Sequence, residues 1–252
     1  MALHLHRLII KKDAYPTKPL IIVAGHSRTG TSVMFRCLNA SKFNVYEPAL
    51  IGGPPPTEDT LFKRYSYHIA DDIGVEKLGN GKYEYFAKGL FYPDVLIGFL
   101  EKRNGVCGKT QNKMQIFLNY LGTHNIELLK NPQLAWSLDE WVKFDPIFAN
   151  AKYIWMHREP LEVAKSSIRL RLKNVPYFRG KLTTRKALEI YHNHQEQYGK
   201  LMPRLKHIKV QMEDFIAKKP EVIDKISDFI ERPLNTTPIT LDETWKVSGV
   251  IK

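Results

Sequence analysis

The sequence predicts an α/β fold, a single domain with a central, mostly parallel sheet flanked by helices. Short apolar runs alternate with segments of helical pattern, which is typical of parallel strands joined by helices. Three of these runs stop at a polar residue just before proline, in "YEP", "LKNP" and "HREP". With 252 residues, the chain can bury the core of one large domain. We expect one domain over residues 1–252, with its core at about 20–235.

The individual elements follow from where each apolar run begins and ends. Glycine, proline and polar residues bound the runs, and a periodicity of 3.6 marks the helices between them. We expect strands at 20–24, 43–46, 126–129, 151–156 and 207–211, and helices at 31–40, 134–144, from 160 and at 184–201. The segment 58–104 has a mainly helical pattern with many aromatic residues.

The three proline motifs predict where ligands bind. Proline forces the preceding residue into extended geometry and favours the first turn of a following helix. Glu47, Lys130 and Arg158 are therefore expected at or near the carboxyl ends of strands. In an open parallel sheet, ligands bind at that edge. The loop "GHSRTGTS" at 25–32 also follows a strand, so it should lie at the same edge.

This loop has the outline of a phosphate-binding P-loop. Gly25 and Gly30 are five residues apart, and the chain then enters a helix whose first N–H groups can bind an anion. Thr31 stands where the Walker pattern has its lysine, and the loop carries its cation as Arg28 instead. The loss of that lysine argues against ATP hydrolysis with magnesium. An ordinary structural turn remains an alternative reading of the loop alone.

A second candidate anion site lies in "HREPLEVAKSS". Arg158 follows a strand, Pro160 begins a helix, and Ser166 lies about two turns along it. A surface salt bridge would account for Arg158 by itself. An arginine and a hydroxyl beside a helix N-terminus, at the edge that holds the first loop, favour a phosphate instead. Two separate phosphate sites predict a nucleotide phosphorylated at two ribose positions.

These residues resemble the sulfotransferases that use 3′-phosphoadenosine 5′-phosphosulfate (PAPS) as donor. "GHSRTGTS" is similar to the family's 5′-phosphosulfate loop, and "HREPLEVAKSS" to its 3′-phosphate element. "YEPA" at 46–49 and the Lys-x-Pro of "LKNP" are similar to elements of the carbohydrate and tyrosylprotein branch, rather than the cytosolic small-molecule branch. The resemblance implies a P-loop-like α/β domain that transfers a sulfonate group to a hydroxyl or amine and leaves 3′,5′-ADP.

The resemblance also implies roles for individual residues. The donor would be bound by Arg28, Thr29, Gly30, Thr31 and Ser32 at its 5′-phosphate and by Arg158 and Ser166 at its 3′-phosphate. Arg28 and Lys130 would stabilise the charge that develops during transfer, so no metal is required. Glu47 is the expected general base, with a structural ion pair as its alternative role. His26 is a second candidate base, expected in an exposed loop.

The charge of the chain points to an anionic partner. Lys and Arg number 38 against 26 Asp and Glu, which gives a net charge of +12. A nucleic-acid-binding module is therefore one alternative, supported by charge alone, and an atypical P-loop kinase or NTPase is the other. His192 and His194 lie two apart on a helix, so they cannot bind one metal together, and both are expected to be solvated.

The remaining expectations concern location and acceptor. No apolar run approaches the ~20 residues of a membrane helix, and the first ten residues do not resemble a secretory signal. We expect a cytoplasmic protein without a membrane span and without a nucleic-acid partner. The acceptor would be a small-molecule or carbohydrate-like hydroxyl, recognised by an insertion at 50–104 and by residues 172–185.

Overall fold

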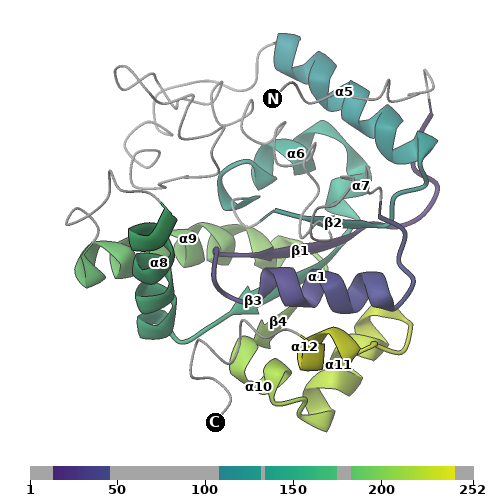
Figure 1. The fold of residues 1–252 in the computed structure, drawn as a ribbon. Coiled ribbons are helices and arrows are strands. Elements are labelled where there is room, and N and C mark those ends of the chain that lie inside the picture. The colour runs from purple at the N-terminus through teal and green to yellow at the C-terminus, as the bar shows by residue number, and fades with distance from the viewer. Residues whose placement is uncertain (1–13, 46–107, 132–133, 175–182, 242–252) are drawn as a thin grey trace.

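The computed structural model describes residues 14–45, 108–131, 134–174 and 183–241 (Figure 1). Its centre is a four-stranded sheet in the order β2-β1-β3-β4, in which every neighbouring pair is parallel. The strands are Ile21–Gly25 (β1), Leu128–Lys130 (β2), Lys152–His157 (β3) and His207–Gln211 (β4). The predicted single α/β domain with a parallel sheet is confirmed.

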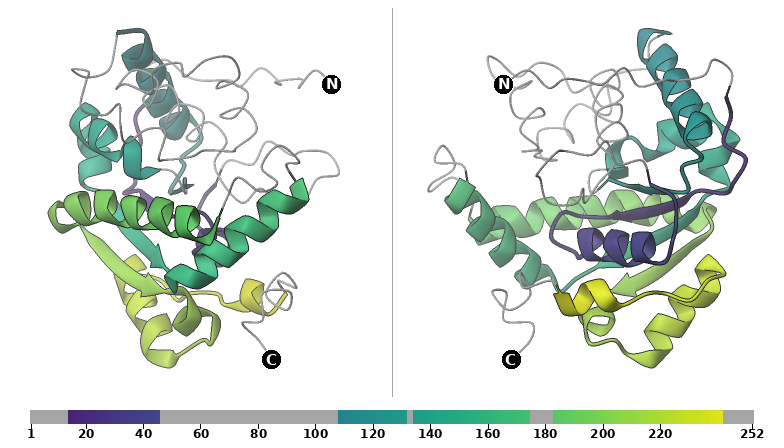
Figure 2. Two further views of the ribbon diagram at one scale, coloured as in Figure 1. Left: turned by 90° about the vertical axis from the view of Figure 1, so that its left-hand side faces the viewer. Right: turned by 45° about the vertical axis from the view of Figure 1, so that its right-hand side comes forward.

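Helices cover both faces of this sheet (Figures 1 and 2). On one face lie α5 (Gly108–Thr123), α6 (Leu138–Phe144), α7 (Pro146–Ala149) and α9 (Thr184–Leu201). On the other lie α1 (Thr31–Ala40), α10 (Met212–Ile216), α11 (Pro220–Ile230) and α12 (Thr237–Leu241). The helix α8 (Pro160–Asn174) packs against α9.

Two hydrophobic clusters hold these layers together, one on each face of the sheet. Successive side chains of a strand point to opposite faces. Ile22 and Ala24 of β1 therefore join the cluster under α5 and α9, while Ile21 and Val23 join the cluster under α1 and α11. Because both faces are covered, β1 reads in the sequence as an unbroken apolar run.

Most predicted elements occur, and two are wrong in part. Helix 31–40 and strand 207–211 have the predicted bounds. The expected helix at 134–144 is divided into a 3-10 turn, Leu134–Trp136, and α6. The helix α5 was not predicted. The mainly helical expectation for 58–104 lies outside the described residues.

The expected strand at 43–46 is wrong for residues 43–45, which have no strand geometry; Tyr46 lies outside the described residues. The reason is the way Asn44 is bonded. Its side-chain amide donates to the carbonyl oxygens of His124 and Asn125, and its backbone N–H donates to the Glu127 carboxylate. Its carbonyl accepts from the N–H groups of Glu127 and Leu128. The Asn44 N–H thus bonds to a side chain instead of to a neighbouring strand.

None of the described helices is both long and apolar enough to cross a bilayer.

Candidate functional site

The loop after β1 is a tight turn with left-handed backbone. Gly25, Arg28 and Gly30 have φ values of 137°, 77° and 87°. The buried Thr29 closes the turn, because its Oγ1 donates to the His26 carbonyl at 2.6 Å. A side chain at Gly25 would place its Cβ 2.7 Å from the Met156 carbonyl oxygen, so the close approach of β1 and β3 requires glycine here.

The helix α1 begins directly after this turn, and its N-terminus has no side-chain cap. Gly30 is the N-cap residue and offers no side-chain acceptor, and the first turn of α1 contains no acidic residue. The first N–H groups of a helix have no partner within the helix. With its dipole, such a helix end is suited to bind an anion. Thr31 and Ser32, the first two residues of α1, add hydroxyl groups.

Lys130 ends β2 and reaches the same helix end. Its side chain is almost fully buried, with 2% exposed, and its Nζ donates to Ser32 Oγ at 2.8 Å. The parallel register pairs Lys130 with Val23 of β1, which explains why a residue of β2 lies so close to the loop. A buried cation therefore lies at the N-terminus of α1.

Arg158 follows β3, and Pro160 is the first residue of α8, as the proline motif predicts. The N-terminus of α8, unlike that of α1, carries a side-chain cap. The Glu159 carboxylate caps it by accepting the Glu162 N–H at 2.8 Å. At least one N–H group of this helix end is therefore already bonded, so side chains matter more here than at α1 for binding an anion.

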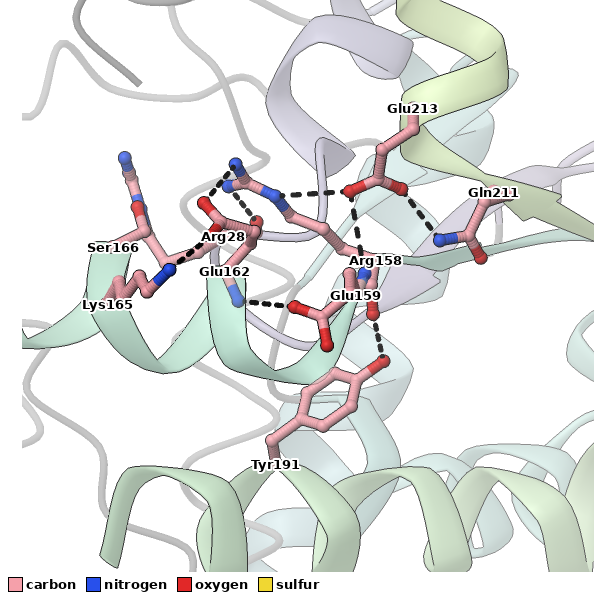
Figure 3. A network of polar contacts seen from close by, with 9 residues as sticks. All are labelled: Arg28, Arg158, Glu159, Glu162, Lys165, Ser166, Tyr191, Gln211 and Glu213. Carbon is pink, nitrogen blue, oxygen red and sulfur yellow. Dashed lines mark hydrogen bonds and ion pairs between the residues drawn. The ribbon is translucent and has the colours of Figure 1, made fainter. Parts of the chain in front are cut away.

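Hydrogen bonds join the first junction, between β1 and α1, directly to the second junction, between β3 and α8 (Figure 3). Arg28 Nε donates to Ser166 Oγ at 2.9 Å, and Arg158 Nη1 donates to the Arg28 carbonyl oxygen at 3.2 Å. Tyr191 of α9 fixes the second junction from below, because its hydroxyl donates to the Arg158 carbonyl at 2.8 Å. The structure thus brings together Arg28, Arg158 and Ser166, which the sequence assigned to two phosphate sites.

The guanidinium of Arg158 is buried, with 2% of its side chain exposed, and lies between two carboxylates. Its Nε is 3.6 Å from Glu213 Oε1, and its Nη2 is 4.0 Å from Glu162 Oε2. At these distances the contacts are ion pairs rather than hydrogen bonds, and Nε and Nη2 have no hydrogen-bond acceptor in the part of the chain described. A hydrogen bond from Lys165, with the charges of Lys165 and Arg158, holds the pKa of Glu162 below its usual range.

A model of one protein family, described as the Sulfotransferase family, matches residues 19–236. The chain belongs to the sulfotransferase family. The predicted resemblance is confirmed at this level, and the assignment to a branch stays a prediction.

The first of two similar solved structures agrees with this in fold. A sulfotransferase domain from the curacin biosynthetic pathway is 16% identical, with a TM-score of 0.52 over 88% of this chain and 76% of that one. Sulfotransferase STF9 from Mycobacterium avium is also 16% identical, with a TM-score of 0.48 over 94% of this chain and 70% of that one. No curated protein matches the sequence.

Two histidines of this sulfotransferase, His26 and His194, are buried, whereas the sequence predicts that both are exposed to solvent. His26 is buried, with 6% exposed, and its ring packs edge-on against Tyr191 and His194 at centroid distances of 5.6 and 4.7 Å. The expectation of an exposed loop histidine is therefore wrong. His194 is buried too, not solvated, and burial lowers its pKa well below the ordinary value. Within the described ranges, no three His, Cys, Asp or Glu residues are grouped to hold a metal ion.

Local sequence patterns did not indicate Glu213 or Tyr191, and the predicted base Glu47 lies outside the described residues. The segment "VQMED" at 210–214 is a poor match to the apolar strand and aspartate that bind magnesium in NTPases. Its glutamate instead contacts Arg158. The available signal was its position just after the last strand, where its side chain could reach the same edge of the sheet.

Proposed function

We propose that this sulfotransferase transfers a sulfonate group from PAPS to an acceptor hydroxyl and leaves 3′,5′-ADP. The observation that carries the proposal is the buried Arg158 guanidinium beside the β1–α1 loop. Buried N–H groups are almost always hydrogen-bonded, so a guanidinium whose Nε and Nη2 lack acceptors in the described ranges favours an anionic ligand. The guanidinium also donates a hydrogen bond to the Arg28 carbonyl in the β1–α1 loop, and this loop is suited to bind a second anion.

The proposal assigns the two phosphates of the donor to the two junctions. N–H and hydroxyl groups of Thr29, Gly30, Thr31 and Ser32 would bind the 5′-phosphate. Arg158 and Ser166 would bind the 3′-phosphate. The uncapped N-terminus of α1 supports the first assignment, and the buried guanidinium supports the second.

Two cations would assist the transfer. As the acceptor oxygen bonds to sulfur, the bond from sulfur to the bridging phosphate oxygen breaks, and the leaving phosphate gains negative charge. Arg28 in the loop and Lys130 at the end of β2 would stabilise this charge. Lys130 already contacts Ser32 at the start of α1, so its charge need not move far.

Glu47 would take the proton of the acceptor hydroxyl. Burial of His26 against α9 favours Glu47 over this histidine as the base. The variant Glu47→Gln should lower kcat by roughly 10²- to 10⁴-fold and leave the affinity for 3′,5′-ADP unchanged. Near-normal turnover in this variant would show that another group is the base.

The experiment that tests the donor is a thermal shift of the purified chain with 3′,5′-ADP, 5′-AMP and ATP with magnesium. Ligand that binds the native state stabilises it by about 2.7 kcal/mol at 100 times its Kd. We expect the largest rise in Tm with 3′,5′-ADP. A rise with ATP and magnesium but none with 3′,5′-ADP would favour the kinase or NTPase alternative. Incubation of labelled PAPS with a panel of hydroxyl compounds then identifies the acceptor.

A further inference from the structure

We propose that Glu213 is a positioning residue that holds the Arg158 guanidinium in place for the 3′-phosphate of the donor. This inference rests on the proposed function. Glu213 lies in α10, two residues after the end of β4. The parallel register pairs Gln211 with His157, so Glu213 and Arg158 follow neighbouring strand ends. The pairing of β3 with β4 therefore brings this carboxylate to the second junction.

Both oxygens of the Glu213 carboxylate are held (Figure 3). Its Oε2 accepts a hydrogen bond from Gln211 Nε2 at 2.6 Å. Its Oε1 accepts from the Glu159 N–H at 3.5 Å and lies 3.6 Å from Arg158 Nε. A carboxylate fixed at two points offers the guanidinium a defined partner, which a freely rotating surface glutamate would not.

Glu213 is the nearer of the two carboxylates around Arg158. Glu162 is farther, at 4.0 Å, and its Oε1 is bonded to Lys165 Nζ at 2.8 Å. A charge as buried as that of Arg158 needs an opposite charge beside it. Without Glu213, we expect the guanidinium to turn toward Glu162 and solvent, and so to lose its hydrogen bond to the Arg28 carbonyl.

The alternative effect of Glu213 is repulsion of the phosphate, since both are anions. The two effects have opposite signs. If positioning dominates, removal of the carboxylate weakens recognition of the 3′-phosphate. If repulsion dominates, removal strengthens it. The contact between Glu213 and Arg158 is long, so the Arg158 Nε hydrogen has no hydrogen-bond acceptor among the residues described. Glu213 therefore does not take the place of a phosphate on Arg158, which favours positioning over repulsion.

The test is the ratio of the Kd for 5′-AMP to the Kd for 3′,5′-ADP, measured by calorimetry on the full chain. This ratio reports only the contribution of the 3′-phosphate. We expect Glu213→Ala to lower it about tenfold or more, because a charge-assisted hydrogen bond is misaligned. Glu213→Gln keeps an acceptor oxygen near Arg158 and should preserve most of the ratio.

Asp214→Ala is the matched control. Asp214 is the next residue, its side chain is 36% exposed as is that of Glu213, and it pairs with Lys219 rather than Arg158. This control should leave the ratio unchanged. In an Arg158→Ala background, Glu213→Ala should change the ratio no further, because the two residues act through one contact.

The outcomes separate this inference from the proposed function. If the unmodified chain binds 3′,5′-ADP no better than 5′-AMP, the proposed function fails. If the unmodified chain discriminates and Glu213→Ala and Glu213→Gln discriminate equally well or better, the positioning role is overturned and the proposed function stands. Should Glu213→Ala fail to fold, Glu213→Gln is compared with Asp214→Ala: a ratio measurably below that of the control supports positioning, and a ratio equal to it or above it contradicts positioning.

Discussion

The two junctions at the edge of the sheet, β1–α1 and β3–α8, have the same topology but offer an anion different groups. Their strands are adjacent, with Gly25 of β1 paired to Met156 of β3. The first junction has left-handed backbone, an uncapped helix and an exposed arginine. The second has a proline, a helix capped by Glu159 and a buried arginine. One strand-to-helix connection therefore presents backbone N–H groups, and the other presents a side chain.

The largest expected effect tests the backbone character of the first junction. Gly25→Ala would force a Cβ to within 2.7 Å of the Met156 carbonyl and 2.9 Å of Thr29 Oγ1, at a φ of 137°. Backbone strain and the clash should lower the free energy of unfolding by about 3 kcal/mol or more. Urea denaturation monitored by circular dichroism measures this change.

Gly199→Ala is the control for that substitution. Gly199 lies in α9, and a Cβ there would meet nothing within 4 Å. Alanine should therefore raise the free energy of unfolding by up to about 1 kcal/mol, as expected for a helix interior. Equal effects of the two substitutions would contradict the requirement for glycine at the end of β1.

Local chemistry in the sequence was enough to predict the strand ends. Proline restricts the residue before it whatever the rest of the chain does, and so Lys130 and Arg158 lie where the motifs indicated. The left-handed loop could also be anticipated, because glycines at 25 and 30 permit backbone that other residues avoid.

Features that depend on packing could not be predicted in this way. The contact between Glu213 and Arg158 requires the pairing of β3 with β4, which no local pattern specifies. Burial of His26 requires α9 to cover the loop. The apolar pattern at 43–46 predicts a strand, because alternation of apolar residues carries no information about the side-chain bonds of Asn44.

The next prediction separates the roles of the two arginines. Arg158→Ala removes a buried cation and leaves Glu213 and Glu162 facing each other, so the Kd for 3′,5′-ADP should rise roughly 10- to 100-fold. Arg28 is exposed, and we expect Arg28→Ala to lower kcat more than it weakens binding of 3′,5′-ADP. Calorimetry and initial rates with PAPS and the acceptor found in the panel measure the two effects.

Arg158→Lys refines this comparison, because lysine keeps the charge and loses the planar fork of donors. It should bind 3′,5′-ADP with an affinity between those of the unmodified chain and Arg158→Ala. If Arg28→Ala and Arg158→Ala raised the Kd equally with no effect on kcat, the division between a transfer junction and a binding junction would be wrong.

The smallest expected effect is a change in how the free energy of unfolding depends on pH. It involves the buried histidine that directly precedes Arg158. His157 ends β3 with 8% exposed, and its ring lies 4.2 Å from that of Trp155. Burial, with the charge of Lys209, lowers its pKa from 6.5 to about 3. Between these two values the unfolded chain binds a proton that the native chain does not. The free energy of unfolding therefore falls as the pH is lowered through this window, by up to about 1.4 kcal/mol per pH unit for this residue.

His157→Phe keeps a ring beside Trp155 and removes the titrating imidazole. The free energy of unfolding should therefore fall less steeply between pH 7 and pH 5, by up to about 1.4 kcal/mol per pH unit. Urea denaturation at pH 8, 7, 6 and 5 gives the slope, and the pH 8 value isolates any change in packing from the effect of titration. The lowered pKa of Glu162 does not interfere, since the stabilisation from a carboxylate is lost only as the pH falls below its unfolded value of 4.5. An unchanged slope in His157→Phe would show that the native chain does not lower the pKa of His157, and hence that the strand end before Arg158 admits water.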